Sequence, residues 1–482
     1  MTAPHEAANL LPLNITLAGN SVFFGGHKVP LSLSIGLCVL VGPNGSGKSE
    51  TLRWLRDHLR HKVQIPANRK VVYLAAGRNS VFESFRSKSG VGGPGHVNSE
   101  PAAVGHQSWK NHWSQFEGNM GMLFRLKERP DLLLKIEARL QALFQRRLRL
   151  DWSQSGLQVG FSSTLGGTPY YANAEASGIL ELVPLLAAIY DNEIGALLID
   201  EPEISLHPQL QAFLLQEMEA FAGDPVDAAK KLIVFATHSP TILPVRRIKD
   251  IPRLVFFTDI QKSPIQISID AGELKSVKLA ALVARLSENH KLAFFSRRVL
   301  LVEGPSDEIV VSGLALKLEH RLLGSNTQVV PVTGKGQFNE TVKLFRLMGK
   351  DVFVLADLDG LGGTERLIPP LSSIRGRPAE RFVSSSPTRD VNSGSRATAS
   401  GSKLLLYRRL HKPRRIVTEL AHDLVVIRLF DGHRLQPVFR QPQQPRVRIG
   451  HQHRRMRGHH DLANRRLLHP PHQLQELDLA RR

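Results

Sequence analysis

A glycine-rich turn near the amino terminus has the residue types and the spacing that bind phosphate. It reads Gly-x-x-x-x-Gly-Lys-Ser, after an apolar run and before an amphipathic segment. Glycines let backbone N–H groups close around a phosphate, and the amino end of the following helix adds partial positive charge. We expect Lys48 to reach the β- and γ-phosphates of a nucleotide and Ser49 to bind Mg²⁺. The predicted nucleotide-binding residues of this turn are Gly42, Pro43, Asn44, Gly45, Ser46, Gly47, Lys48 and Ser49.

Two later apolar runs end in residues that suit the same reaction. The run ALLI leads into Asp200 and Glu201, and KLIVFA leads into Thr237 and His238. A buried strand that ends in Asp-Glu places the aspartate beside Mg²⁺ and the glutamate where it polarises the attacking water. We therefore predict Asp200 as a metal ligand, Glu201 as a catalytic residue and His238 as a catalytic residue that senses the γ-phosphate. A structural surface histidine is the alternative for His238.

A second set of carboxylates follows strand-like runs further along the chain. Glu303 ends the run VLLV, Asp307 opens the next helical segment, and Asp357 and Asp359 end the run DVFVLA. Carboxyl ends of parallel strands meet at one edge of a sheet, and clustered carboxylates without cationic partners call for divalent metal. Two such ions activate water and stabilise a leaving 3′ oxygen in phosphodiester cleavage. All four residues are predicted metal ligands, and Glu303, Asp357 and Asp359 are also predicted catalytic residues. The alternative is that these acids only cap helices or lie in solvated loops.

The repeated order of strand, turn and helix predicts an α/β protein of more than one domain, as the 482-residue length also favours. We expect an ATPase domain over 1–270, a linker helix over 271–295 and a smaller, incomplete doubly wound domain over 296–385. A low-order basic tail is expected over 386–482. The charged run LLLKIEARLQALFQRRLRL is expected to form one amphipathic helix.

The basic charge of the chain belongs mainly to its last quarter. The whole chain has 63 Lys+Arg against 43 Asp+Glu, but residues 361–482 alone hold 24 against 9. Arginine outnumbers lysine 22 to 2 in that segment. Three interpretations stay open: a disordered arm that binds nucleic acid, a small folded domain, or an out-of-frame translation. The high overall charge is therefore weak evidence of DNA binding.

Other features exclude several classes of protein. One cysteine excludes a disulfide scaffold and a cysteine-rich zinc site. No apolar stretch approaches the roughly 20 residues of a membrane helix, and the first residues lack the pattern of a signal peptide. We expect a cytoplasmic protein with no membrane partner.

The motifs GPNGSGKS, LLIDEPEISLHP and ATHSP resemble, in order and spacing, those of ATP-binding-cassette ATPases and their AAA-like relatives in the SMC and OLD (overcoming lysogenization defect) families. The resemblance implies a homodimer or higher oligomer, with ATP held between one protomer's phosphate loop and the other's signature segment. Ser177 and Gly178 lie where that signature is expected, although they depart from its usual form. They are predicted nucleotide-binding residues, and the alternative is a helix start with Ser177 as its N-cap.

The segments VEGPSD and DLD resemble a TOPRIM domain, and a cassette ATPase followed by TOPRIM is the OLD-family arrangement. The resemblance covers about residues 10–365. It implies an ATP-hydrolysing DNA endonuclease. ATP and Mg²⁺ would bind at the first site, and Mg²⁺ or Mn²⁺ would bind at the second. The resemblance also implies a role in defence against foreign DNA, with an accessory defence protein as a candidate partner. The further ligands and catalytic lysine of OLD-family TOPRIM domains have no counterpart in the tail. The alternative is therefore a DNA-associated ATPase of the SMC or recombination type with an inactive or truncated TOPRIM domain.

Overall fold

The computed structural model describes residues 9–63, 65–66, 68–78, 103–332, 337–357 and 424–428. A six-stranded sheet of order β12-β11-β3-β10-β9-β4 lies at the centre of its first half, and all strands except β12 run parallel. The phosphate-binding turn and the Asp-Glu and Thr-His segments follow β3, β9 and β10 at the same edge of this sheet. The strands are β3 (Leu37–Val41), β4 (Lys70–Leu74), β9 (Ile194–Asp200), β10 (Leu232–Thr237), β11 (Leu254–Phe256) and β12 (Ile265–Gln266).

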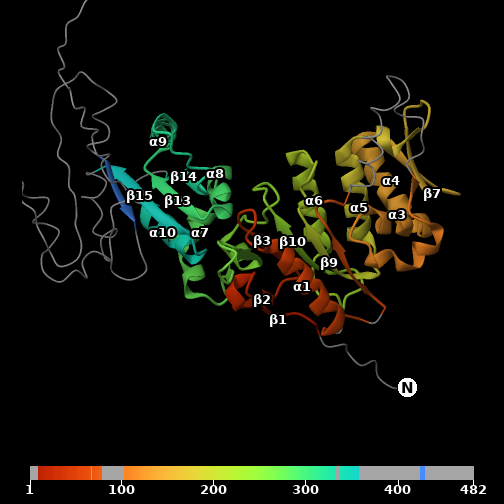
Figure 1. The fold of residues 1–482 in the computed structure, drawn as a ribbon, viewed down its shortest axis with the longest axis horizontal. Coiled ribbons are helices and arrows are strands. Elements are labelled where there is room, and N and C mark those ends of the chain that lie inside the picture. Colours follow the sequence, from red (N-terminus) through yellow and green to blue (C-terminus); the bar gives the residue numbers. More distant parts are fainter. Residues whose placement is uncertain are drawn as a thin grey trace, which may run out of the picture. The chain divides into compact units, whose positions relative to one another are not determined.

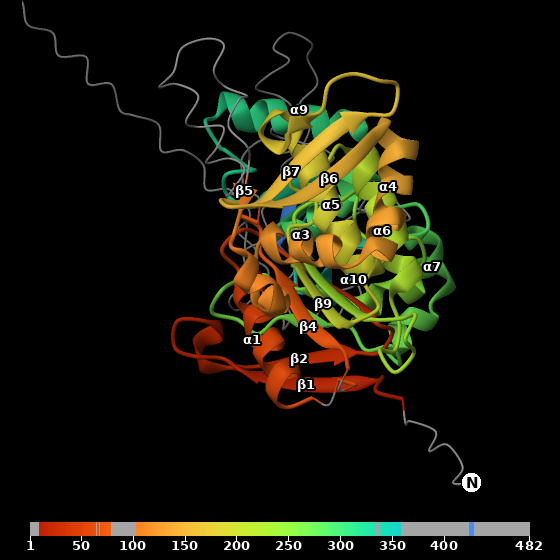
Figure 2. The same ribbon diagram turned by 90° about the vertical axis from the view of Figure 1, so that its right-hand side faces the viewer.

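The two faces of the central sheet carry two separate hydrophobic cores, because successive side chains of each strand point to opposite faces. One face packs against helix α1 (Lys48–His61) and the hairpin of β1 (Leu13–Ala18) and β2 (Lys28–Leu33). The other face packs against α3 (Asn119–Glu128), α4 (Pro130–Phe144), α5 (Ser177–Tyr190) and α6 (Pro208–Phe221). Figure 2 shows the hairpin and α1 on one side of β4 and β9, with α3, α5 and α6 on the other. Near-continuous apolar runs such as LCVLV and LIVFAT are typical of strands buried on both faces.

A small antiparallel sheet covers the outer helices. It contains β5 (Ala103–Val104), β6 (Arg146–Ser153), β7 (Gly156–Ser163) and β8 (Tyr170–Tyr171). The run expected as one amphipathic helix is only partly helical, because α4 ends at Phe144 and the chain turns at Gln145 with φ +58. The following RRLRLDWS alternates exposed and buried residues, which is the period of a strand.

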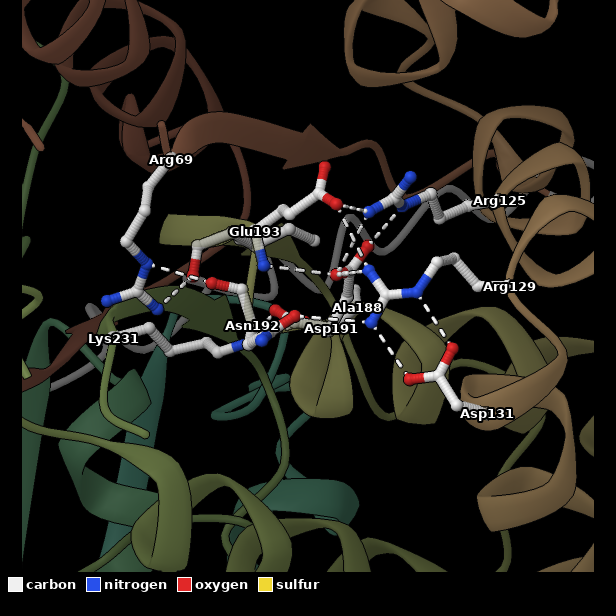
Figure 3. Close-up of polar contacts among 10 residues, drawn as sticks. Arg69, Arg125, Arg129, Asp131, Ala188, Asp191, Asn192, Glu193 and Lys231 are labelled. Atoms are coloured by element: carbon white, nitrogen blue, oxygen red, sulfur yellow. Dashed lines mark hydrogen bonds and ion pairs between the residues drawn. The ribbon is translucent and has the colours of Figure 1, made fainter. Parts of the chain in front are cut away.

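A charged cluster joins the amino ends of three sheet strands to the outer helices (Figure 3). Asp191 is fully buried and accepts a hydrogen bond of 2.7 Å from Nε of Arg125. Lys231 Nζ donates to the carbonyls of Ala188 and Asp191, both at 2.8 Å. Arg69 donates to the carbonyls of Asn192, Ile194, Pro225 and Asp227. These contacts fix β4, β9 and β10 at the edge opposite the phosphate-binding turn.

The expected linker helix is two short helices, α7 (Val277–Val283) and α8 (Glu288–Leu292). They are separate because Ser287 starts a new helix, with a capping box between Ser287 and His290. A second sheet of order β14-β13-β15-β16 follows (Figure 1). Its elements are β13 (Arg298–Val302), α9 (Pro305–Lys317), β14 (Thr327–Pro331), α10 (Phe338–Leu347), β15 (Asp351–Asp357) and β16 (Leu424–Arg428).

One segment of the expected low-order tail is a strand of this second sheet. β16 pairs antiparallel with β15, from Phe353 opposite Arg428 to Asp357 opposite Leu424. The rest of 386–482 lies outside the described residues. In the part of the chain that is described, no helix has the length and apolar character to cross a membrane.

Candidate functional site

Lys48 lies on the phosphate-binding turn as the first residue of α1. Its Nζ donates hydrogen bonds of 2.9 Å to the carbonyls of Gly42 and Pro43. Burial lowers the pKa of Lys48 to about 8, although the carboxylates of Asp200, Glu201 and Glu203 act in the opposite direction. The amine is therefore still mainly charged near neutral pH, and the turn that holds it lies at the same edge of the sheet as the carboxylates at the end of β9.

The glycines of the turn are required by its geometry. Gly45 and Gly47 have φ values of +71 and +96, a region that side chains disfavour. A Cβ on Gly47 would lie 2.7 Å from the ring of Phe24, and one on Gly42 would lie 2.3 Å from the carbonyl oxygen of Phe257. The turn is thus built as a close backbone loop at the start of a helix, which suits a phosphate group.

The turn after β9 carries Asp200 and Glu201 as predicted. Asp200 is buried, and Tyr73 lies with its hydroxyl 3.5 Å from the carboxylate. Glu201 is partly exposed and has the unusual φ of +48 for a residue with a side chain. Burial, followed by the charge of Asp200, raises the pKa of Glu201. A raised pKa makes this carboxylate a better proton acceptor, as a general base requires.

His238 lies beside Glu201, with Nε2 3.4 Å from Oε1 of the carboxylate. Burial and the charge of Lys48 lower the pKa of His238 to about 4. The imidazole is therefore neutral at pH 7, and its contact with Glu201 is not an ion pair. The backbone N–H of His238 donates to Oε1 of Glu203 at 2.6 Å.

Ser177 and Gly178 lie in the first turn of α5, and the N-cap of this helix is Ala176. The alternative that gave Ser177 the N-cap position is therefore wrong by one residue. Gly178 approaches the turn that follows Glu201, because a Cβ there would lie 2.8 Å from the carbonyl oxygen of Ser205. This places the predicted signature segment against the Asp-Glu turn of its own chain. Its contact with nucleotide stays a prediction.

The predicted carboxylates of the second sheet share one edge in their backbone positions. β13 and β15 are parallel neighbours, with Leu301 opposite Val354, and Glu303 and Asp357 lie two and three residues further on. Asp307 lies in the first turn of α9, and its Oδ2 accepts the backbone N–H of Gly304 at 2.9 Å. Asp307 thus has the capping role of the alternative interpretation, and its role as a metal ligand stays a prediction.

The structure describes the side chains of Glu303 and Asp307 but not those of the other two predicted carboxylates. Asp359 lies outside the described residues, and Asp357 is described only as the last residue of β15. Among the side chains that the structure describes, no three His, Cys, Asp or Glu form a metal-binding group. The four-carboxylate metal site therefore stays a prediction.

Sequence reasoning missed three residues around the candidate nucleotide site. Glu203 lies in the same EPE segment as Glu201, so a second carboxylate two residues on was a visible signal. Arg78 is buried four residues after the end of β4 and contacts the carbonyls of Asp200 and Glu201. Neither Arg78 nor Tyr73 belongs to a recognisable motif, so only the fold identifies them.

Two protein-family profiles match this chain. The profile "AAA domain, putative AbiEii toxin, Type IV TA system" matches residues 123–243, and "Overcoming lysogenization defect protein-like, TOPRIM domain" matches residues 294–359. The first match contains the Asp-Glu and Thr-His segments, and the second contains all four predicted carboxylates. The predicted α/β class and the OLD-type order of domains are therefore confirmed.

Two curated relatives are similar over part of the chain. An OLD nuclease of Thermus scotoductus is 28% identical over 218 residues, which is 44% of this chain and 38% of that protein. The endonuclease GajA of Bacillus cereus is 30% identical over 123 residues, 25% of this chain and 19% of that protein. This chain thus matches well under half of the length of both relatives. Among solved structures, an SMC head bound to the C-winged helix domain of ScpA is similar with a TM-score of 0.32 and 13% identity, covering 53% of this chain and 97% of that one.

Proposed function

We propose that this chain, which has the OLD-family order of an AAA-type ATPase domain followed by a TOPRIM domain, is an ATP-hydrolysing, metal-dependent DNA endonuclease. The observation that carries the ATPase is that the glycine-rich turn with Lys48 and the Asp200–Glu201 pair follow the parallel strands β3 and β9 at one edge of the central sheet. The endonuclease rests on the TOPRIM match, which contains Glu303 and the Asp-Leu-Asp segment.

Each residue of the first site has a role that its surroundings support. Lys48 and the backbone N–H groups of the glycine-rich turn bind the β- and γ-phosphates of ATP. Glu201 accepts the proton of the attacking water, since its pKa is raised. Neutral His238 offers an imidazole group beside Glu201 to orient the water or the γ-phosphate.

The chemistry of the donors also fits a divalent cation. Ser49 and Asp200 offer the hydroxyl and carboxylate oxygens that Mg²⁺ prefers, and a bound Mg²⁺ would neutralise charge on the β- and γ-phosphates. At the second site, Glu303, Asp307, Asp357 and Asp359 would hold Mg²⁺ or Mn²⁺, which would stabilise the leaving 3′ oxygen of a cleaved phosphodiester.

The proposal includes DNA as substrate, a homodimer or higher oligomer as the working form, a cytoplasmic location and a role in defence against foreign DNA. The names of the two relatives, a nuclease and an endonuclease, support a nucleic acid as the substrate. Ser177 and Gly178 are the residues proposed to contact ATP bound by another protomer.

Nicking of supercoiled plasmid tests the proposal. We expect nicking with Mg²⁺ or Mn²⁺, a loss of about 100-fold or more in Glu303→Ala, and unchanged ATP hydrolysis in that variant. In Lys48→Ala we expect ATP hydrolysis to be lost while the Glu303 site is intact. Nicking that survives Glu303→Ala would contradict the assignment of the nuclease site.

A second function is favoured by the short extent of the TOPRIM match, which ends at residue 359. It is a DNA-associated ATPase of the SMC or recombination type with an inactive or truncated TOPRIM domain. ATP hydrolysis that depends on Lys48, with no nicking by the wild-type chain in either metal, would select this function over the first.

A further inference from the structure

Arg78 is a buried cation that the proposed chemistry does not use. Its side chain is 0% exposed, and it lies four residues after Leu74, the last residue of β4. Buried arginines are rare unless they are paired, because removing a charge from water is costly. Burial lowers the pKa of Arg78, whereas Glu181, Glu203 and Asp200 raise it. The contacts of the Arg78 side chain must therefore offset the cost of burying its charge.

The guanidinium donates to three main-chain carbonyls. Nη1 lies 3.0 Å from the oxygen of Asp200 and 3.2 Å from that of Ala75, and Nη2 lies 3.3 Å from the oxygen of Glu201. These bonds fix the path of the backbone through the Asp-Glu turn. Glu201 has a φ of +48, and a left-handed conformation is unfavourable for a residue with a side chain, so this backbone path depends on contacts that stabilise it.

Arg78 also pairs with a carboxylate of a different element. Its Nε lies 2.6 Å from Oε2 of Glu181, which is 3% exposed and belongs to α5. Glu181 is three residues after Gly178 and lies on the same face of α5, so the helix face that carries Gly178 is linked to Arg78. The close approach of Gly178 to Ser205 is a second, separate contact between α5 and the same turn.

We propose that Arg78 is a positioning residue for ATP hydrolysis, which holds the Asp200–Glu201 backbone and couples it through Glu181 to the helix that carries Ser177 and Gly178. The inference rests on the proposed ATPase function. A planar guanidinium donates to the three carbonyls and forms the ion pair with Glu181 at the same time. A lysine at this position would keep the positive charge but not the several N–H donors of the guanidinium.

Arg69 supplies a matched control at the other end of the same strand. It is also buried and donates to four main-chain carbonyls, but these lie at the edge opposite the nucleotide site. Arg69→Lys and Arg78→Lys therefore remove the same kind of contact. A merely structural role predicts that both variants lose stability and that both keep their catalytic constants.

The experiment measures kcat and KM for ATP, the Mg²⁺ concentration at half-maximal rate, and Tm, in full-length wild type, Arg78→Lys, Arg69→Lys and Glu181→Gln. For Arg78→Lys we expect kcat to fall at least tenfold, KM to change less than threefold, and the half-maximal Mg²⁺ concentration to rise, because Asp200 is no longer held. Glu181→Gln leaves the three carbonyl contacts in place and should lower kcat by a smaller factor. Arg69→Lys should lower Tm and keep kcat within threefold.

Two results would overturn the inference. One is a kcat of Arg78→Lys within threefold of that of Arg69→Lys at a temperature where both are folded. The other is an unchanged Mg²⁺ dependence. A wild-type chain without ATP hydrolysis would instead contradict the proposed function. In that case, binding of a fluorescent ATP analogue with and without Mg²⁺ tests the inference. The enhancement of binding by Mg²⁺ should be lost in Arg78→Lys and kept in Arg69→Lys.

Discussion

Among the individual residues, Glu203 connects the Asp-Glu turn to the end of β10. Its carboxylate accepts the backbone N–H of His238 at 2.6 Å. Burial raises the pKa of Glu203, and this hydrogen bond opposes that rise. The contact determines where His238 lies relative to Glu201, although Glu203 itself was not among the predicted site residues.

Replacement of Glu203 should show whether it acts through this hydrogen bond. Glu203→Ala should lower kcat for ATP by about 10–100-fold, since a hydrogen bond to a charged group contributes about 1.5–3 kcal/mol. Glu203→Gln keeps an acceptor oxygen and should stay within about threefold of wild type. Steady-state hydrolysis assays measure both, with Glu219→Ala on α6 as a control carboxylate. Equal losses in Gln and Ala variants would contradict this role.

Among the helices and strands, the two edges of the central sheet differ in what they hold. The carboxyl edge carries the glycine-rich turn, Asp200 and Thr237, which form the proposed nucleotide site. The amino edge is closed by the charged cluster around Asp191, which the outer helices join through Arg125 and Arg129. The cluster supplies buried partners for the carbonyls at the strand starts, which would otherwise be costly to leave unsatisfied.

Lys231 gives this cluster a pH dependence that can be measured. Burial lowers its pKa from 10.5 to about 7, with the charge of Asp191 acting in the opposite direction. Between these values the unfolded chain binds a proton that the folded chain lacks, so the folded state gains stability as pH rises. The gain is lost again as pH falls toward 7. The slope for this residue is at most about 1.4 kcal/mol per pH unit.

Urea unfolding between about pH 7.5 and 9.5 measures this slope. Lys231→Met should be less stable at the upper pH, since it loses two hydrogen bonds, but its free energy of unfolding should rise less steeply with pH. Lys70→Met, which changes an exposed lysine at the start of β4, should keep the wild-type slope. Parallel slopes in wild type and Lys231→Met would contradict a neutral buried lysine.

In the molecule as a whole, β16 brings residues 424–428 into the sheet that holds the predicted carboxylates. Its partner β15 ends at Asp357, so the strand lies next to the backbone of a proposed catalytic residue. A domain that ends at residue 385 would leave this edge of β15 unpaired, and an unpaired strand edge favours aggregation through pairing with other chains.

Two shortened chains test the contribution of β16. A chain that ends at Val438 keeps the strand and should melt within about 2 °C of the full chain. A chain that ends at Ser385 lacks the strand and should lose a few kcal/mol of stability, since each strand hydrogen bond contributes about 0.5–1.5 kcal/mol. Thermal melting of the two chains measures the difference, and equal melting temperatures would contradict the pairing of β16 with β15.

Local spacing along the chain was enough to predict the parts of this protein that depend on neighbouring residues. The glycine-rich turn and the Asp-Glu and Thr-His ends of buried strands follow from spacing and apolar runs. The OLD-type order of the two domains rests instead on the resemblance of their motifs to that family. Two predictions were wrong for local reasons. Residues 132–150 do not form one helix, and the expected linker helix is two short helices. A helix end at Gln145 and a new start at Ser287 depend on single residues, which periodicity over a long window does not resolve.

Contacts between distant residues, by contrast, were visible only in the packed molecule. Arg78 contacts Asp200 and Glu201 across more than 120 positions of the chain, and β16 pairs with β15 across about 70. No motif marks these contacts, because a buried guanidinium or an edge strand acquires partners only when the sheet and helices have packed. The residue types of the proposed nucleotide site can therefore be predicted from the sequence, whereas the contacts that hold these residues in position are a property of the fold.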